Sequence, residues 1–318
     1  MGTAVRLGLV CKFREQPIRF RTSTAAALLR LPSLERAAKL SGLCAANAEA
    51  LTAAIEFCAA KGIGCFRIGS QILPLKTHPA VGYELANLPE GRAIMGAFER
   101  CGRLARRKGV RLCFHPDQFV VLSSPRENVV ERSIAELDYQ AEVAQWVSAD
   151  VINVHAGGGY GDKREALNRF RNNYKRLSRA ARRRLTVEND DCVYAPTDLL
   201  PICEQVGLPL VYDVHHHRCL SDGLTIEEAT RAALATWNRE PLFHVSSPLG
   251  GWGAARPAYH ADFISPADLP ASWRALAITV EVEAKAKELA VLDLMRQLDA
   301  TSFERGSKPA HSRLRSRA

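Results

Sequence analysis

The sequence predicts one α/β domain folded as a single (β/α)8 (TIM) barrel. Eight short apolar or β-branched runs alternate with longer amphipathic stretches along the 318 residues. Imidazole and carboxylate side chains stand where most of these runs end, and 47% of the residues are apolar, which is ample for a large core. An open, doubly wound sheet is the rival fold, but it would not gather polar residues from so many strands at one point, whereas a barrel would.

The expected strands, in chain order, cover residues 5–10, 63–68, 110–114, 150–154, 184–187, 209–212, 242–246 and 277–282. Helical periodicity fills the intervals and the end of the chain, over about 33–61, 90–108, 126–147, 163–182, 197–206, 224–236 and 284–299. The link 247–276 is rich in Gly, Pro and Trp, so we expect an active-site loop with one short helix there. We expect the barrel domain to span 1–300. A basic tail without apolar period, expected to be disordered, follows over 301–318.

The charge balance points to a polyanionic partner. The formal net charge is +9, so basic residues dominate the surface and suit nucleic acid. The nine cysteines are odd in number and form no C-x-x-C pair, which is typical of reduced thiols in a cytosolic protein. No apolar stretch long enough for a signal peptide opens the sequence, and we expect no 18-residue apolar run elsewhere. We therefore expect a cytoplasmic protein without a membrane partner, associated with the nucleoid if it is bacterial.

Seven of the nine histidines lie at, or just beyond, the ends of expected strands, and acidic residues occupy the same kind of position. They fall in RLCFHPDQF, DVINVHAGG, RRLTVENDD, LPLVYDVHHH, PLFHVSS, PAYHADFI and ITVEVEAKAKE. In a barrel, the carboxyl ends of all strands face one cavity, and that face carries the chemistry. The pattern therefore predicts a metal-dependent enzyme with several divalent cations in one pocket.

Three groups of ligands follow from the strand order. The first group is His115, His155 and Glu188; the second is Asp213, His244 and Glu283; the third joins Asp213 with His216 and His260. Mixed imidazole and carboxylate ligands suit Zn, Mn or Fe and argue against an all-oxygen Mg or Ca cage. The triple histidine 215–217 offers three candidates, of which only one or two can face the metals.

The chain resembles a known family at these residues, the UV-damage endonucleases, over about residues 5–295. The matching segments are RLGLVCKF near the start, FRIGSQILP (66–74), FHPDQFV (114–120), INVHAGGGYGDK (152–163), LTVENDD (185–191), VYDVHHH (211–217), FHVSS (243–247) and VEAKAKE (282–288). The resemblance implies an endonuclease IV-like barrel, a cluster of two to three metal ions, commonly manganese, and incision of DNA on the 5′ side of a photolesion. It also implies the ligand set His115, His155, Glu188, Asp213, His216, His244, His260 and Glu283.

The same resemblance assigns Gln118 and Phe119 to probing the duplex at the lesion. An aromatic side chain suits this role because it can replace lost base stacking. Three positions depart from the family pattern: Leu9 stands where some members have a tyrosine, Gln71 where some have a histidine, and Leu242 where some have a modified lysine. We expect Leu9 to supply an apolar contact in place of that tyrosine.

Phosphodiester hydrolysis needs an activated water and neutralisation of the phosphate, which clustered cations provide. Glu188 is the expected catalytic carboxylate, bridging metals, and Lys285 is the expected catalytic lysine. Lys163 and Lys287 are further candidates for contacts with backbone phosphates. Double-stranded DNA with UV photolesions is the expected partner of a monomeric enzyme. Two rival readings stay open: a sugar isomerase of the xylose-isomerase type, and a non-catalytic, metal-stabilised nucleic-acid-binding protein.

Overall fold

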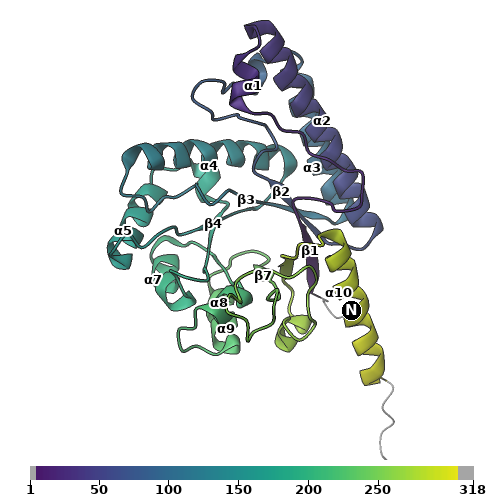
Figure 1. Cartoon of the computed structure of the whole chain (residues 1–318), viewed down its shortest axis with the longest axis vertical. Helices are drawn as coiled ribbons and strands as arrows, with labels where there is room; N and C mark the ends of the chain where they lie inside the picture. Colours follow the sequence, from purple (N-terminus) through teal and green to yellow (C-terminus); the bar gives the residue numbers. More distant parts are fainter. Residues whose placement is uncertain (1–4, 307–318) are drawn as a thin grey trace, which may run out of the picture.

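Eight parallel strands form the centre of the structure, a computed structural model that describes residues 5–306 (Figure 1). The strands are β1 (Arg6–Val10), β2 (Cys65–Gly69), β3 (Arg111–His115), β4 (Val151–His155), β5 (Leu185–Glu188), β6 (Leu210–Val211), β7 (Leu242–Val245) and β8 (Thr279–Val282). They pair in the order β6-β5-β4-β3-β2-β1-β8-β7. Between β6 and β7 an isolated parallel bridge joins Asp213 to His244, so the sheet is curved into a nearly closed barrel. The predicted (β/α)8 fold is confirmed.

Helices follow the strands and cover the barrel. They are α1 (Ala25–Leu29), α2 (Ser33–Ala60), α3 (Gly91–Lys108), α4 (Glu127–Val147), α5 (Lys163–Tyr174), α6 (Arg179–Arg182), α7 (Pro196–Val206), α8 (Val214–Cys219), α9 (Ile226–Ala235) and α10 (Glu288–Gly306). Figure 1 shows α2 and α3 side by side and α10 next to β1. One expected helix is divided. The stretch 163–182 contains the two helices α5 and α6, because Ser178 caps a new helix by accepting from the N–H of Ala181.

The end of the chain also differs from the expectation. Helix α10 continues to Gly306, so the first residues of the predicted tail 301–318 extend the helix. The remainder of that tail, 307–318, lies outside the described residues. The prediction of disorder there stays a prediction.

Helix α2 corrects the expectation that the chain has no long apolar run. On length and composition alone it could cross a membrane. Its apolar side chains are accounted for by packing, since Leu40, Leu51 and Ile55 are buried in the core and the helix lies against α3. A core helix passes the same test of length and composition, so α2 is weak evidence for a membrane segment.

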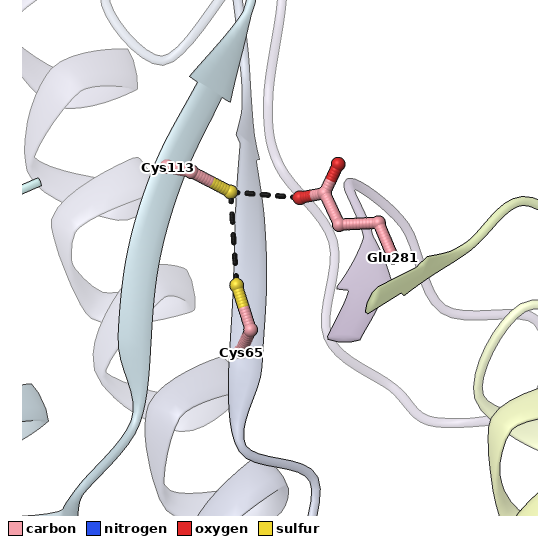
Figure 2. Close-up of side chains that lie close together, drawn as sticks. All are labelled: Cys65, Cys113 and Glu281. Carbon is pink, nitrogen blue, oxygen red and sulfur yellow. Dashed lines mark hydrogen bonds between the residues drawn. The ribbon is translucent and has the colours of Figure 1, made fainter. Parts of the chain in front are cut away.

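The interior of the barrel is unusually polar for a fold whose strands normally fill it with branched aliphatic residues. Arg67 and Glu281 are buried within hydrogen-bonding distance of each other, and Cys65 and Cys113 lie on neighbouring strands beside Glu281 (Figure 2). Gly8 on β1 leaves room for them. A Cβ there would stand 3.1 Å from Cβ of Cys65 and 3.3 Å from Cγ of Glu281, which is tighter than ordinary van der Waals contact.

The alternation of side-chain directions along β1 shows that the contact expected of Leu9 is wrong. Because Gly8 faces the barrel interior, its neighbours Leu7 and Leu9 face the surrounding helices. Leu9 is completely buried in that layer. It therefore cannot supply an apolar contact to DNA in place of the family tyrosine.

The link between β7 and β8 has the predicted form of an active-site loop. It contains one short 3₁₀ helix, η2 (Ala271–Ala275), and an antiparallel bridge between Pro248 and His260. Four large apolar side chains of this loop are exposed: Leu249, Trp252, Tyr259 and Phe263. The loop thus forms part of the rim above the carboxyl ends of the strands.

Candidate metal centre

The first group of predicted ligands occupies the last residues of three neighbouring strands. His115 ends β3, His155 ends β4 and Glu188 ends β5, and His155 pairs with Glu188 in the register of the sheet. Nε2 of His115 lies 3.0 Å from Oε2 of Glu188, and Nε2 of His155 lies 3.8 Å from the same oxygen. The ends of the three strands therefore bring two imidazoles close to one carboxylate.

The second carboxylate, Asp213, lies at the start of a helix that was not predicted from the sequence. Strand β6 ends early and the chain turns into α8, with Asp213 as the N-cap that accepts from the N–H of His216 at 2.8 Å. This places Nδ1 of His216 3.3 Å from Oε1 of Glu188 and 3.5 Å from Oδ2 of Asp213. His216 is thus the member of the triple histidine that contacts both carboxylates.

The other two histidines of α8 face elsewhere. His217 lies between the hydroxyl of Tyr212 at 2.7 Å and Oδ1 of Asp222 at 2.8 Å. His215 is fully buried beside Trp252 and His260, and neither ring nitrogen has a hydrogen-bond partner within residues 5–306. These surroundings leave His217 fully engaged in structural hydrogen bonds.

Strands β7 and β8 bring the remaining ligands. Nδ1 of His244 lies 3.1 Å from Oε1 of Glu188 and 3.6 Å from Oε1 of Glu283. His260, on the loop after β7, is further out, with Nδ1 3.8 Å from Oε2 of Glu283 and 3.4 Å from Oγ of Ser246. His260 therefore stands beside Glu283, and its ring centroid lies 6.2 Å from that of His216. The expected group of His260 with Asp213 and His216 stays a prediction.

These side chains form three overlapping groups whose ligand atoms lie within 4.8 Å of one another. The groups are His115 with His155 and Glu188; Glu188 with Asp213 and His216; and Asp213 with His244 and Glu283. Glu188 links the first two groups and Asp213 links the last two, so two carboxylates can each serve neighbouring cations. Oδ2 of Asp213 and Nδ1 of His244 are buried and have no hydrogen-bond partner among the described residues. Mixed nitrogen and oxygen donors with orphaned buried atoms fit divalent cations such as Mn, Zn or Fe.

The electrostatics of the cluster agree with that fit. Burial by itself favours a neutral carboxyl, but His244 and His155 hold the pKa of Glu188 well below its usual range. Burial likewise opposes ionisation of Glu283, yet Arg67 and His244 lower its pKa. Burial opposes the imidazolium as well, but Glu188 outweighs it and raises the pKa of His244 to about 10. Without metals, protons on imidazoles balance the buried carboxylates; divalent cations supply the same charge.

Sequence reasoning missed the residues that support the ligands. The amide nitrogen of Asn153 donates to Oε2 of Glu188, and the side chain of Asn189 pairs with the backbone of Asp213 at 2.9 Å in both directions. Asn153 could have been found from the two-residue period of strands, because it lies two residues before His155 on β4 and faces the same side. Asn189 carries no comparable signal, since it acts through a loop that packs against β6.

A tight turn on the rim presents the two residues assigned to lesion probing. The N–H of Val120 donates to the carbonyl of Asp117 at 2.9 Å, which puts Gln118 and Phe119 at the tip. Phe119 is 79% exposed, so it is not a core residue. It lines a cavity of ≈ 430 Å³ together with Gln71, Tyr160, Arg126 and Arg132.

The predicted lysines are placed differently from one another. Lys285 is exposed and lines a cavity of ≈ 440 Å³ with Lys287, His260, Glu283 and Tyr259, so it stands at the mouth of the ligand cluster. Lys163 instead forms an ion pair with Asp198 at 3.1 Å. Its charge is therefore already paired.

Nearly the whole chain matches one family model, described as UV-endonuclease UvdE, over residues 5–314. The chain belongs to this UV-endonuclease family. The UV DNA damage endonuclease of Bacillus velezensis is 32% identical over 290 residues, which are 88% of this chain and 89% of that protein. Among solved structures, SacUVDE aligns with a TM-score of 0.82 and 28% identity over 94% of this chain and 99% of its own.

The structure of endonuclease IV from Thermus thermophilus aligns over 94% of this chain and 99% of its own, with a TM-score of 0.61 and 17% identity. At that identity the likeness concerns the fold alone, and it confirms the endonuclease IV-like barrel. Membership of the UV-endonuclease family makes the chain an enzyme of the nuclease class. The predicted resemblance is confirmed, and it favours the nuclease over both the sugar isomerase and the non-catalytic binding protein.

Proposed function

We propose that this UV endonuclease is a metal-dependent DNA repair enzyme that incises the backbone on the 5′ side of UV photolesions. The observation that carries the proposal is the set of three ligand groups joined through Glu188 and Asp213 at the open mouth of the barrel. A structural metal site is normally closed by four protein ligands, whereas a catalytic site keeps a position for water or substrate. Groups of three ligands at a rim have that open position.

The residues of the chain have separate roles in this proposal. His115, His155, Glu188, Asp213, His216, His244 and Glu283 would hold two to three divalent cations, with manganese as the proposed metal and His260 as an outer ligand. Such cations neutralise the phosphate and lower the pKa of water to about 7. Glu188 fixes the spacing of the first two groups and so positions the scissile phosphate against the attacking water. Lys285, exposed at the mouth, contacts a backbone phosphate there.

Gln118 and Phe119 are proposed to recognise the lesion by its distortion. A photolesion weakens pairing and stacking, so opening the duplex there costs part of the few kcal/mol required for intact DNA. An exposed ring at the tip of a turn fits into the opened step without reading a base. The cavity beside Phe119 is lined by Arg126 and Arg132, which suit the phosphates that flank the opened nucleotides.

The proposed partner is double-stranded DNA, bound by a monomer in the cytoplasm or at the nucleoid. The formal charge of +9 supports this partner, because each neutralised phosphate releases counterions and strengthens binding. The exposed aromatic and basic side chains stand on the same rim as the ligand cluster, above the carboxyl ends of the strands.

A nicking assay tests the proposal. Plasmid DNA, irradiated or untreated, is incubated with the protein and manganese, and an end-labelled duplex with one photolesion maps the cut. We expect nicking of irradiated plasmid only, removal of activity by a chelator, and a cut 5′ to the lesion. Equal nicking of both plasmids, or a cut on the 3′ side, would contradict the lesion specificity or the polarity. Isomerisation of a pentose or hexose without any nicking would revive the sugar isomerase.

A further inference from the structure

The loop that follows β4 holds a tyrosine in a backbone conformation that this residue rarely adopts. The N–H of Asp162 donates to the carbonyl of Gly159 at 2.9 Å, so Tyr160 and Gly161 are the central residues of a tight turn. Both have positive φ angles, 48° at Tyr160 and 85° at Gly161. Such turns favour Gly, Asn or Asp at these positions, because a bulky side chain is strained in the left-handed region.

Contacts with neighbours hold the ring of Tyr160 in place, although the residue is 50% exposed. The guanidinium of Arg169 stands over the ring, 5.6 Å from its centroid. Arg169 is itself fixed, because its Nε donates to the carbonyl of Ser123 at 2.8 Å. The ring also lies against the backbone of Gly158, where a Cβ would stand 3.4 Å from Cζ of the ring. The tyrosine hydroxyl has no hydrogen-bond partner within residues 5–306, so the ring and not the hydroxyl is anchored.

The loop after β4 packs directly onto the segment that follows β3, which carries Phe119. Gly157 makes this close approach possible, because a Cβ there would overlap Cγ1 of Val121 and stand 2.6 Å from Oγ of Ser123. The hydroxyl of Ser123 also donates to a backbone carbonyl of the loop after β4, at 2.5 Å. The positions of Tyr160 and Phe119 on the rim are therefore set relative to each other.

Tyr160 and Phe119 line the same cavity, whose volume is ≈ 430 Å³. This volume lies within the range of about 300–1,000 Å³ that is typical of sites for small organic molecules. Four charged residues also line the cavity and balance one another in formal charge: Arg126, Arg132, Asp117 and Glu136. The cavity therefore does not select an anion by charge alone. Its two exposed aromatic rings indicate a flat, uncharged ligand, and a nucleobase has that shape and stacks on such rings.

We propose that Tyr160 determines specificity: its ring stacks on a nucleobase that the lesion has released from the duplex, in the cavity shared with Phe119. An intact duplex keeps its bases stacked, so only DNA that opens brings a base to the ring. Backbone strain of this kind persists where the surrounding structure enforces it, and it clusters at functional sites. The inference rests on the proposed function only in that the enzyme binds DNA with photolesions.

DNA binding without cleavage tests the proposal. The full-length chain is mixed at low salt, with a chelator that prevents cutting, with a fluorescent duplex that contains one photolesion or none, and anisotropy gives both affinities. Tyr160→Asn removes the ring and introduces a residue that tolerates a positive φ angle. We expect affinity for the lesion duplex to fall about 5- to 150-fold, the loss of one base–aromatic stack, and affinity for the intact duplex to stay at the wild-type value.

Two variants separate stacking from damage to the loop. Tyr160→Phe keeps the ring and should bind the lesion duplex like the wild type. Ser148→Asn relieves another positive φ angle, 59°, at the exposed C-cap of α4, just before β4 begins and so at the opposite end of the barrel; it should leave both affinities unchanged. Tyr160→Asn should not melt at a lower temperature than the wild type, because relief of strain offsets the lost contact with Arg169. Wild-type affinity of Tyr160→Asn for the lesion duplex, or an equal loss for both duplexes, would overturn the proposal.

A second measurement uses the wild-type sequence and so does not depend on any variant folding. Iodouracil is placed in turn at each position around the photolesion, long-wavelength ultraviolet light crosslinks it to a stacked aromatic ring, and mass spectrometry identifies the residue. We expect a crosslink to Tyr160 from the lesion duplex and none from the intact duplex; crosslinks that never include Tyr160 would overturn the proposal. If these results hold while manganese-loaded protein does not cut irradiated DNA, the proposed function fails and the role of Tyr160 in DNA binding stands. Lesion-specific cutting that Tyr160→Asn retains in full has the opposite meaning.

Discussion

Asp213 and His244 face each other across the seam of the barrel, where they form a parallel bridge between the ends of β6 and β7. The N–H of His244 donates to the carbonyl of Tyr212 at 3.1 Å, and Nδ1 of His244 lies 3.9 Å from Oδ2 of Asp213. The contact that closes the barrel therefore also sets the distance between two proposed ligands. A change that loosens this seam should weaken metal binding before it unfolds the remaining strands.

Glu188→Gln should abolish nicking of irradiated DNA while lesion binding survives. The amide keeps the shape of the side chain but loses the charge that links two ligand groups. We expect a loss at least as large as the about 10–100-fold found when supporting residues of metal sites are removed. Plasmid nicking measures activity and fluorescence anisotropy measures binding. Glu165→Gln makes the same chemical change at an exposed position of α5 and should stay active; wild-type nicking by Glu188→Gln would exclude it as a metal ligand.

Phe119→Ala should lower the preference for irradiated over intact DNA and leave metal content unchanged. A ring stacked on a base contributes about 1–3 kcal/mol, so the preference should fall by about 5- to 150-fold. Because the ring is 79% exposed, the melting temperature should hardly change. Leu34→Ala removes another exposed apolar side chain, on α2, and serves as the control. Unchanged selectivity of Phe119→Ala would remove the ring from lesion recognition.

Manganese affinity should rise with pH. Although burial opposes the charge, Glu188 raises the pKa of His244 to about 10, and Asp213 and Glu188 raise that of His216 well above its usual range. Both imidazoles are thus protonated at pH 7 in the metal-free protein and must lose a proton to bind metal. Affinity should rise about 10-fold per pH unit for each proton released.

The same shift gives a second, metal-free readout. A raised pKa contributes stability that is full below the unfolded value of about 6.5 and is lost as the pH rises towards 10. The metal-free protein should therefore melt at lower temperature as the pH increases over that window.

Titration calorimetry of manganese binding, in buffers of different ionisation enthalpy, counts the protons that the protein releases when the metal binds. The variant His244→Gln should release one proton fewer than the wild type, and His78→Gln, outside the cluster, should release the same number as the wild type. A count of zero protons for the wild type would contradict the charge balance.

DNA binding should weaken steeply with salt, and Lys285 should account for part of the slope. A protein that contacts about 6–10 phosphates loses about 10³–10⁵ in affinity between 50 and 200 mM salt. Lys285→Gln should reduce the slope of log K against log salt by about 1, since it removes one phosphate contact. Lys61→Gln makes the same change at the exposed C-cap of α2, just before β2 begins and so at the opposite end of the barrel. Affinity independent of salt would contradict an electrostatic DNA surface.

Most of the barrel and of the ligand set could be predicted because both depend on local sequence. A short apolar run defines a strand, and the residue that ends it, such as His115 or Glu188, falls at the mouth of the barrel. Helix α8 could not be predicted, because three consecutive histidines have no apolar periodicity. It forms because Asp213 caps its N-terminus.

The contacts inside the barrel could not be predicted either. Arg67 and Glu281 are separated by most of the chain, and they meet because β1 lies between β2 and β8. From sequence alone, a charged residue two positions before Glu283 is indistinguishable from one on the surface. The bridge between Pro248 and His260 within the long loop could not be predicted for a related reason, since it joins two irregular segments.

The absence of a side chain at Gly8 makes this position sensitive although it offers no functional group. A single methyl group there would press on Glu281 and Cys65, tilt the carboxylate and so disturb His244 on the other side of β8. A screen for loss of DNA repair should consequently return substitutions at residue 8 whose products fold, stay abundant in the cell and bind DNA, yet hold too little metal to cut it.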